Sequence, residues 1–378
     1  MHLSKEILNY IESHNQEAID LLIELAQIPA PSNHEEKRAT FCKDWFKTQG
    51  CKNVYIDEAL NVIWPIGVTD DNPVAVIMAH SDVVFPDTTP LPLAIAEGKI
   101  HCPGIIDDTA NAVALMMAAK YIAQNNLLPK GMGVLLVVNS GEEGLGNLKG
   151  SRQIVKDFEG RIKEFISFDD KNSHGVNTAV GSKRYEIEVT TEGGHSFNDF
   201  GNRNSIAQLA SIINKLYDVT LPPKGKTTYN VGLISGGTSV NTIAQQAKML
   251  FEFRSDERDS LAYMESYLQS VISDFREKGL NISVNLVGDR PCGIEIEHTK
   301  QQALESRAQD ANKKYYDTAI DFGPGSTDCN IPLSFGIPSI CIGCCYGQGA
   351  HTREEWMDID SLDGGIKVAF EMILHYFY

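Results

Sequence analysis

The sequence contains short, uninterrupted apolar runs that are each followed at once by polar or acidic residues. Val74 to Met78, Val134 to Val138 and Phe165 to Phe168 are each the length of a buried strand. A strongly helical segment, Ala110 to Asn125, lies between the first two runs. Strands that alternate with helices predict an α/β fold, with a mostly parallel sheet that carries helices on its faces.

The two ends of the chain extend this pattern. Apolar residues at helical spacing near the N-terminus predict one helix, which Pro29 and Pro31 bring to an end. A second helix is predicted from Glu35 to Thr48. Towards the C-terminus, Ile337 to Ile342 has the pattern of another buried strand, and Leu362 to Phe377 has that of a closing amphipathic helix.

The middle of the chain has a different pattern. Its predicted elements are a strand containing Tyr185, Ile187 and Val189, a helix from Ser205 to Leu216, strands from Thr228 to Ile234 and Ala247 to Arg254, a helix from Ser260 to Glu277, and a strand from Asn281 to Val287. The order βαββαβ is typical of a ferredoxin-like domain. We therefore expect residues 182–291 to form a domain inserted into a larger one, made of residues 1–181 plus 292–378.

The charge of the chain restricts its partners. Its formal net charge is -17, which argues against nucleic acid and anionic membranes as partners, because phosphate contacts need clustered Lys and Arg. The N-terminal segment lacks the apolar stretch of a signal peptide, and no apolar run is long enough for a membrane span. We expect a cytoplasmic protein without nucleic-acid or membrane partners.

The cysteine pattern does not have the density of a secreted disulfide framework. The 8 cysteines are scattered along the chain, which suits a reducing compartment. Cys344 and Cys345 lie close to His351 in the sequence, which leaves a catalytic thiol conceivable. Small buried apolar residues are the favoured interpretation of this pair. A serine hydrolase is disfavoured because the sequence has no GxSxG motif.

The first polar cluster follows a strand, and the second precedes a helix. His80 follows the first apolar run, and Asp82, two residues on, has the spacing of a carboxylate that orients a metal-binding imidazole. Asp107 and Asp108 stand just before the predicted helix. One aspartate suffices to cap a helix, so we expect Asp108 to cap it while Asp107 points into the cleft.

Acidic pairs also follow the next two strands. Glu142 and Glu143 are adjacent in VVNSGEEGLGN, where two like charges would repel one another unless cations lie beside them. Asp169 begins another acidic pair after its strand, and His351 follows the strand IPSICIG. Because the strand ends meet at one edge of the sheet, these residues predict a site for two divalent cations such as zinc, manganese or cobalt.

The motifs HSD, GIIDD, SGEEG, SFDD, GGHSF, GGTSVNTIA, FRSD, GSTD and AHT occur along the sequence in this order. Together they resemble the co-catalytic di-zinc peptidase and deacylase family that includes tripeptidase T, carboxypeptidase G, acetylornithine deacetylase, succinyl-diaminopimelate desuccinylase and aminoacylase. The resemblance covers nearly the whole chain. It implies a zinc-exopeptidase catalytic domain with an inserted lid or dimerisation domain, and it is nearest to the tripeptidase T-like peptidases.

The resemblance implies a ligand set for two divalent metal ions per chain, most readily zinc, with cobalt and manganese as alternatives. Asp107 is expected to bridge the two ions. His80 and Asp169 are expected to complete the protein ligands of one ion, and Glu143 and His351 those of the other.

The resemblance also implies the catalytic roles. Asp82 is expected to orient His80, and Glu142 to act as the general base that activates a metal-bound water and then protonates the leaving amine. His195, in GGHSF, is expected to stabilise the oxyanion, usually across a homodimer formed through the inserted domain. Asn241 and Arg254 are expected to hold the substrate, whereas the residues alone indicate a turn residue and a surface charge.

Two details refine the expected activity. Thr109, Ala110 and Asn111 follow the aspartate pair, where the family often has Lys and Gly; none of these positions is a metal ligand in the family. Asp169 tends to accompany the peptidases, whereas the deacylases tend to have Glu. We therefore expect a metal-dependent exopeptidase for short peptides, of aminopeptidase, dipeptidase or tripeptidase type. An N-acyl-amino-acid deacylase is the alternative, and a non-catalytic metal-binding scaffold is a more distant one.

Overall fold

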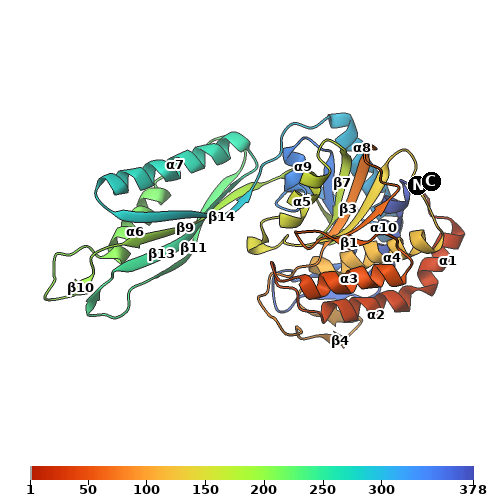
Figure 1. Cartoon of the computed structure of the whole chain (residues 1–378), viewed down its shortest axis with the longest axis horizontal. Coiled ribbons are helices and arrows are strands. Elements are labelled where there is room, and N and C mark those ends of the chain that lie inside the picture. Colours follow the sequence, from red (N-terminus) through yellow and green to blue (C-terminus); the bar gives the residue numbers. More distant parts are fainter. Residues whose placement is uncertain (1) are drawn as a thin grey trace. The chain divides into compact units, whose positions relative to one another are not determined.

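The computed structural model describes residues 2–378 and divides the chain into two compact units. The first unit contains the chain up to Thr178 together with Ile294–Tyr378, and the second is Ala179–Gly293. Each unit has its own hydrophobic core. Figure 1 shows the elements of both units.

The first unit is built on an eight-stranded sheet with the spatial order β1-β2-β6-β3-β7-β16-β8-β15. Its strands are β1 (Tyr55–Ile56), β2 (Val62–Ile66), β3 (Val74–His80), β6 (Gly133–Asn139), β7 (Ile162–Phe168), β8 (His174–Ala179), β15 (Asp321–Gly325) and β16 (Ser339–Ile342). The central strands β6, β3, β7 and β16 are parallel. Every residue of β3 and β6 is buried, as expected for strands covered on both faces. The predicted mostly parallel sheet is confirmed.

The helices of the first unit pack in layers around this sheet (Figure 1). They are α1 (Lys5–Ser13), α2 (Asn15–Ala26), α3 (Glu36–Thr48), α4 (Ala110–Gln124), α5 (Lys149–Asp157), α8 (His298–Tyr316), α9 (Asn330–Ser334) and α10 (Ser361–Leu374). Helix α4 contacts β3, β6 and β7 on one side and α2 and α10 on others. Each of its residues from Ala110 to Ile122 is buried, because its apolar composition suits a helix enclosed all round.

The predicted single N-terminal helix is in fact two. The break falls at His14, whose backbone leaves the helical conformation. The imidazole Nδ1 of His14 lies 2.8 Å from the carbonyl oxygen of Tyr10, and the two rings stack with their centroids 4.0 Å apart. This local contact gives the Tyr10 carbonyl a side-chain partner at the end of α1.

A small four-stranded sheet, unpredicted from the sequence, lies in the first unit. It consists of β4 (Ala94–Ala96), β5 (Lys99–His101), β17 (Gly347–Gln348) and β18 (Trp356–Asp358) in the order β17-β18-β5-β4. Pairing of Trp356 with His101 brings two distant segments together. The loop that carries His351 thereby lies beside the segment that leads to Asp107.

The second unit has the element order βαββαβ. Its elements are β9 (Gly181–Thr190), α6 (Ser205–Tyr217), β11 (Thr227–Gly236), β13 (Gln246–Ser255), α7 (Arg258–Glu277) and β14 (Asn281–Arg290), with the short ribbon β10 (Gly194–His195) and β12 (Thr242–Ile243) beside them. The antiparallel sheet has the order β11-β13-β9-β14. Tyr185, Ile187 and Val189 of β9 pack in one core with apolar residues of α6 and α7, while the residues between them are less buried. The predicted ferredoxin-like order is present.

None of the helices among residues 2–378 has both the length and the apolar character that crossing a lipid bilayer requires.

Candidate metal centre

His80 is the last residue of the buried strand β3, and its imidazole is fixed from both sides. The Nδ1 atom lies 3.0 Å from the backbone carbonyl oxygen of Asp82 and 3.6 Å from its Oδ1. Only the first distance is that of a hydrogen bond, so Nδ1–H donates to the carbonyl. The Nε2 atom faces Asp107, whose Oδ1 is 2.9 Å away, a hydrogen-bond distance at which a metal ion would take the place of the proton. His80 is therefore oriented as a metal ligand.

Asp107 and Asp108 lie in a π-helical turn, Ile105–Thr109, in which both have non-helical backbone angles. The expectation that Asp108 caps the following helix is wrong. Its Oδ2 accepts the backbone N–H of His80 at 2.8 Å, and its Oδ1 accepts Asn111 Nδ2 at 2.6 Å. Helix α4 begins after Thr109 without a side-chain cap, so Asp108 joins the turn to the end of β3.

Asp107 lies between two histidines, with one carboxylate oxygen directed at each. Its Oδ1 is 2.9 Å from His80 Nε2, and its Oδ2 is 3.1 Å from His351 Nε2. Asp169 Oδ1 lies 3.8 Å from His80 Nε2, and Glu143 Oε1 lies 3.0 Å from His351 Nε2. Two groups of donors thus meet at a shared carboxylate, one on each side of Asp107.

The loop that carries Glu142 and Glu143 is held by Asp82. The two oxygens of this buried carboxylate accept the backbone N–H groups of Glu142 at 3.0 Å and Glu143 at 2.9 Å. Gly141 has a φ of +69°, and a side chain at Gly146 would come within 2.6 Å of the Gly141 backbone. The two glycines therefore permit the tight turn that carries the glutamate pair.

The electrostatics of this cluster favour cations. Burial raises the pKa of Glu143 to about 7, and the neighbouring Asp107 carboxylate adds to the rise. Hydrogen bonds to Asp107 and Glu143 raise the pKa of His351 to about 11. Burial also raises the pKa of Asp169. Without metal, these carboxyl and imidazole groups therefore hold protons to a higher pH than usual. Divalent cations would bind the same oxygen and nitrogen atoms in place of those protons.

Donor spacing agrees with this interpretation. His80, Asp107 and Glu143 offer ligand atoms within 4.8 Å of one another, and so do His80, Asp108 and Asp169. Asp108 already accepts two hydrogen bonds, which makes Asp107 the more suitable partner of His80 and Asp169. Imidazole nitrogens and carboxylate oxygens in this arrangement fit zinc, cobalt or manganese.

His195 and Asn241 lie together in the second unit. His195 pairs with Thr242 across the β10–β12 ribbon, and the N–H of Ser196 donates to the carbonyl of Asn241 at 3.0 Å. The Nδ1 atom of His195 accepts the N–H groups of Phe197 and Asn198, each at 3.3 Å. The neutral ring therefore carries its proton on Nε2 and presents it as a hydrogen-bond donor.

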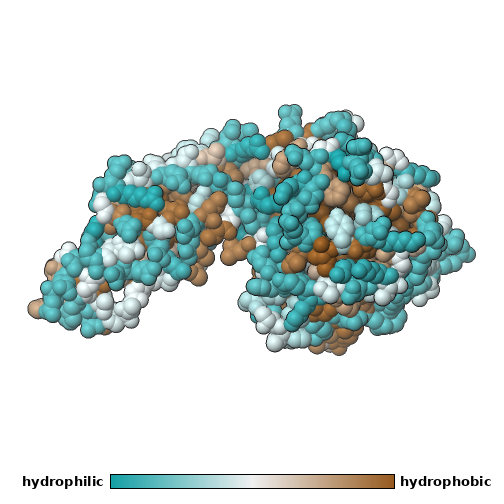
Figure 2. Space-filling view, viewed as in Figure 1, coloured by the Kyte–Doolittle hydropathy of each residue, from teal (hydrophilic) through white to brown (hydrophobic). Residues whose placement is uncertain are grey.

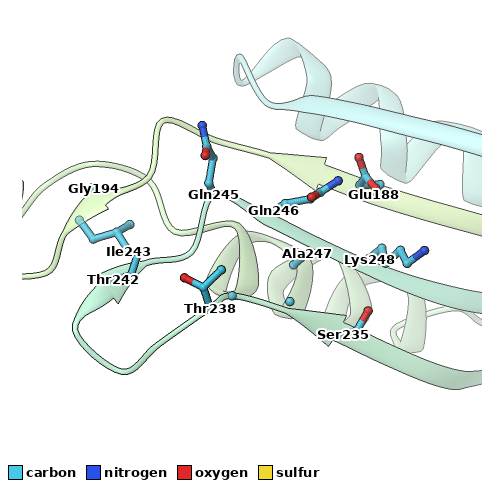
Figure 3. A pocket seen from close by; sticks show the side chains of 12 residues that line it. Glu188, Gly194, Ser235, Thr238, Thr242, Ile243, Gln245, Gln246, Ala247 and Lys248 are labelled. Carbon is cyan, nitrogen blue, oxygen red and sulfur yellow. The ribbon is translucent and has the colours of Figure 1, made fainter.

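A cavity of about 540 Å³ adjoins this ribbon. Figure 3 shows Thr242 and Ile243 of the ribbon together with Thr238, Gln245 and Lys248 around the cavity. Polar side chains predominate among these residues, so the cavity suits a polar ligand.

Arg254 does not lie near His195 in the second unit. It is near the end of β13, paired with Ser182, whereas the ribbon adjoins the beginning of this strand. The 10 residues of β13 extend over roughly 30 Å. The Arg254 guanidinium bonds to Glu252, with Nε 3.1 Å from Oε1.

Comparison with known proteins identifies the family. The model of Peptidase family M20/M25/M40 matches residues 76–375. The chain belongs to this family. A probable succinyl-diaminopimelate desuccinylase of Staphylococcus aureus (strain N315) is 22% identical over 392 residues, which cover 91% of this chain and 94% of that protein.

Solved structures agree on the fold. A tripeptidase from Staphylococcus aureus subsp. aureus Mu50 superposes with a TM-score of 0.74 at 21% identity, covering 95% of this chain and 97% of that one. The dipeptidase Dug1p from Saccharomyces cerevisiae superposes with a TM-score of 0.76 at 16% identity, covering 98% of each chain. The M20/M25/M40 chain described here is therefore a metal-dependent hydrolase of peptide or amide bonds.

One buried acid of this M20/M25/M40 protein has no counterpart among the expected site residues. Glu355 lies four positions beyond His351, and its carboxylate accepts the backbone N–H groups of Gly104, Ile106 and Asp107. In the sequence, Glu355 belongs to the glutamate pair in GAHTREEW, which resembles a solvent-exposed charged pair. The pairing within the small sheet is what places Glu355 against the turn that carries Asp107.

The cysteines are all free thiols, and all 8, which lie within the described residues, are buried. Burial raises the pKa of Cys344 and of Cys345. A nucleophilic cysteine needs exposure and a lowered pKa. The favoured interpretation, that these two residues pack as small apolar side chains, is supported.

Proposed function

We propose that this chain is a metal-dependent exopeptidase that hydrolyses the amide bond of short peptides, with Glu142 as the general base. The observation that carries the proposal is the position of Asp107, whose two oxygens face His80 and His351 separately. This is the arrangement required of a carboxylate that bridges two cations about 3.5–4 Å apart. His80 and Asp169 would hold one cation, and Glu143 and His351 the other.

The two cations and the side chains of the protein have different roles in the proposed reaction. Two divalent ions, which we propose to be zinc, would supply Lewis-acid activation of the amide carbonyl and of water. Glu142, buried next to Glu143, accepts a proton from the attacking water and returns it to the departing amine. Asp82 holds the backbone of both glutamates, so it fixes the position of the base relative to the ligands.

The substrate class follows from one residue of the metal centre and from the relatives. Aspartate at position 169 favours a peptidase over a deacylase within the family resemblance. Solved relatives include a tripeptidase and a dipeptidase, which supports the choice. The curated relatives include probable succinyl-diaminopimelate desuccinylases, so hydrolysis of N-acyl amino acids is the second candidate.

We assign the second unit, residues 182–291 in the predicted division, to substrate binding and dimerisation. The His195 ring presents Nε2–H, which suits a donor to the oxyanion, while Asn241 lies beside it and Arg254 offers a cationic fork for a carboxylate. Because β13 separates His195 from Arg254 by far more than the length of a dipeptide, one copy of this unit does not bring both to the same substrate. We therefore propose that His195 serves the metal centre of a partner copy in a homodimer.

The edge of the second sheet supports dimerisation. Strand β11 is an edge strand with β13 as its neighbour, and Leu233 and Ile234 on it are 50% and 54% exposed. Brown apolar atoms are visible on the second unit among teal ones (Figure 2). An exposed edge with apolar side chains is a surface that pairs readily with another strand.

A substrate panel tests the activity. Amine release would be measured from dipeptides, tripeptides and N-acyl amino acids, with zinc, cobalt or manganese added and with a chelator as the control. Chelator-sensitive cleavage of free-amino peptides is the expected result. Cleavage confined to N-acyl amino acids would replace the peptidase assignment by the deacylase one, and turnover that survives complete metal removal would contradict the mechanism.

A further inference from the structure

Glu355 is a buried carboxylate with 1% of its surface exposed. Its Oε2 accepts the N–H of Gly104 at 2.7 Å. Its Oε1 accepts the N–H groups of Ile106 at 2.8 Å and Asp107 at 3.1 Å. Three backbone donors that converge on one buried carboxyl group form a strong local restraint, because loss of the acceptor would leave buried N–H groups without a partner.

These bonds lie at the turn that carries Asp107. The turn is also closed from within, since the Thr109 N–H and hydroxyl both donate to the carbonyl of Gly104. Asp107 and Asp108 depart from helical geometry there, so the regular hydrogen bonds of a helix do not fix them. The Glu355 carboxylate supplies part of the restraint that the missing helical bonds would otherwise give.

Glu355 also belongs to the segment that carries His351. Its backbone carbonyl accepts the N–H of Cys102 at 3.1 Å, and the following residue, Trp356, pairs with His101. Through its backbone and side chain, Glu355 therefore joins the two segments that supply Asp107 and His351, whose facing atoms are 3.1 Å apart.

We propose that Glu355 is a positioning residue that holds the Asp107 turn against the His351 segment, so that the Asp107 carboxylate is set between the two histidines before a metal binds. The inference rests on the proposed role of Asp107 as the bridging ligand. Glu355 does not itself contact the reacting groups. It acts by fixing the backbone from which the Asp107 side chain extends.

The test compares Glu355→Gln with Glu354→Gln, an exposed glutamate one position earlier. The amide of Gln keeps the length of the side chain but points an N–H₂ group at a backbone donor. Hydrogen exchange over residues 102–109 is measured in the metal-free protein, and zinc affinity is measured by chelator competition. We expect Glu355→Gln to accelerate exchange of the turn and to weaken zinc binding by about 10–100-fold, while Glu354→Gln changes neither.

The kinetic readout separates positioning from general stability. We expect kcat of Glu355→Gln to fall by about 10-fold or more with KM nearly unchanged, and Glu355→Asp, which keeps the carboxyl group on a shorter side chain, to give intermediate values. A variant that loses thermal stability but keeps wild-type exchange in the turn and wild-type zinc affinity would overturn the proposal. If Glu355→Gln does not fold, Glu355→Asp decides by the same measurements.

Hydrogen exchange and zinc affinity are measured without substrate, so the proposed function and the proposed role of Glu355 can be contradicted independently. A wild-type protein that cleaves no member of the substrate panel contradicts the proposed function and leaves the Glu355 measurements interpretable. Unchanged exchange and affinity in Glu355→Gln, in an active enzyme, contradict only the positioning role.

Discussion

The Oδ2 atom of Asp82 accepts the backbone N–H of Glu143 at a distance of 2.9 Å. The same oxygen accepts the hydroxyl of Ser32 at 2.7 Å, and Oδ1 accepts the N–H of Glu142 at 3.0 Å. Asp82 therefore connects the strand end that bears His80 with the loop that bears the proposed base. The side-chain carboxylate of Asp82 accepts the backbone N–H groups of the loop, while the backbone carbonyl of Asp82 accepts the imidazole N–H of His80.

Replacing Asp82 with Asn is expected to disturb both connections. The amide presents N–H₂ to one of the two backbone donors, which leaves a buried polar group unsatisfied. We expect about a 10–100-fold loss of metal affinity or turnover, measured by chelator competition and steady-state kinetics. Asp71→Asn, at an exposed position, is the matched control. Wild-type kinetics in Asp82→Asn would show that the carboxylate does not position the glutamate loop.

Replacing Glu142 with Gln is expected to remove the base and spare the metal ligands. Because Gln has no basic carboxylate, we expect kcat to fall by about 10²–10⁴-fold, with the metal content per chain unchanged by elemental analysis. Glu58→Gln, at an exposed glutamate, should retain full activity. Retention of wild-type kcat in Glu142→Gln would require another base.

Mixing two inactive variants tests whether His195 acts across a dimer. If it does, a heterodimer of His195→Ala and Glu142→Gln contains one intact site, formed by Glu142 of one copy and His195 of the other. After subunit exchange, an equal mixture is expected to recover about a quarter of wild-type activity. A mixture of Glu142→Gln with Glu143→Ala serves as the control and should stay inactive. Absence of recovery with verified exchange would place His195 in the site of its own chain.

The cysteines are expected to resist thiol reagents in the folded protein. Burial raises the pKa of Cys42 to about 12 and that of Cys102 to about 11. A raised thiol pKa keeps the protonated, unreactive form present to higher pH, so at pH 8 about a thousandth of Cys102 is thiolate. A colorimetric thiol assay should detect no rapidly reacting cysteine before denaturation and 8 after it. Rapid labelling that abolishes turnover would contradict this prediction and support a catalytic cysteine.

The sequence predicted the parts of this structure that depend on local pattern. The central strands are apolar throughout because both faces are buried, so runs such as Val74 to Met78 marked β3 within two residues of its end. Residues that follow such strands lie at one edge of the sheet, which is why His80 and Glu143 were expected together. They are found there with Asp107, which precedes α4, and the donor atoms of the three residues lie within 4.8 Å of one another.

Other features depend on contacts that local pattern does not encode. The Asp107–Asp108 pair has the composition of a helix start, yet the backbone of both residues departs from helical geometry, and Asp108 bonds to His80 and Asn111 instead. The role of Glu355 requires the pairing of β18 with β5, two three-residue strands that lie far apart in the sequence. Strands so short carry too little periodicity to be recognised.

The pairing of β9 with β14 has a consequence for the ancestry of the chain. Ser182 near the start of the second unit lies opposite Arg290 near its end, so the chain enters and leaves this unit through adjacent strands. In the larger unit, the whole insertion lies in the connection between β8 and α8. A short turn between these positions would join the flanking segments without extending either, so evolution can gain, lose or exchange the second unit as one module while the order of strands in the metal-binding sheet is inherited unchanged.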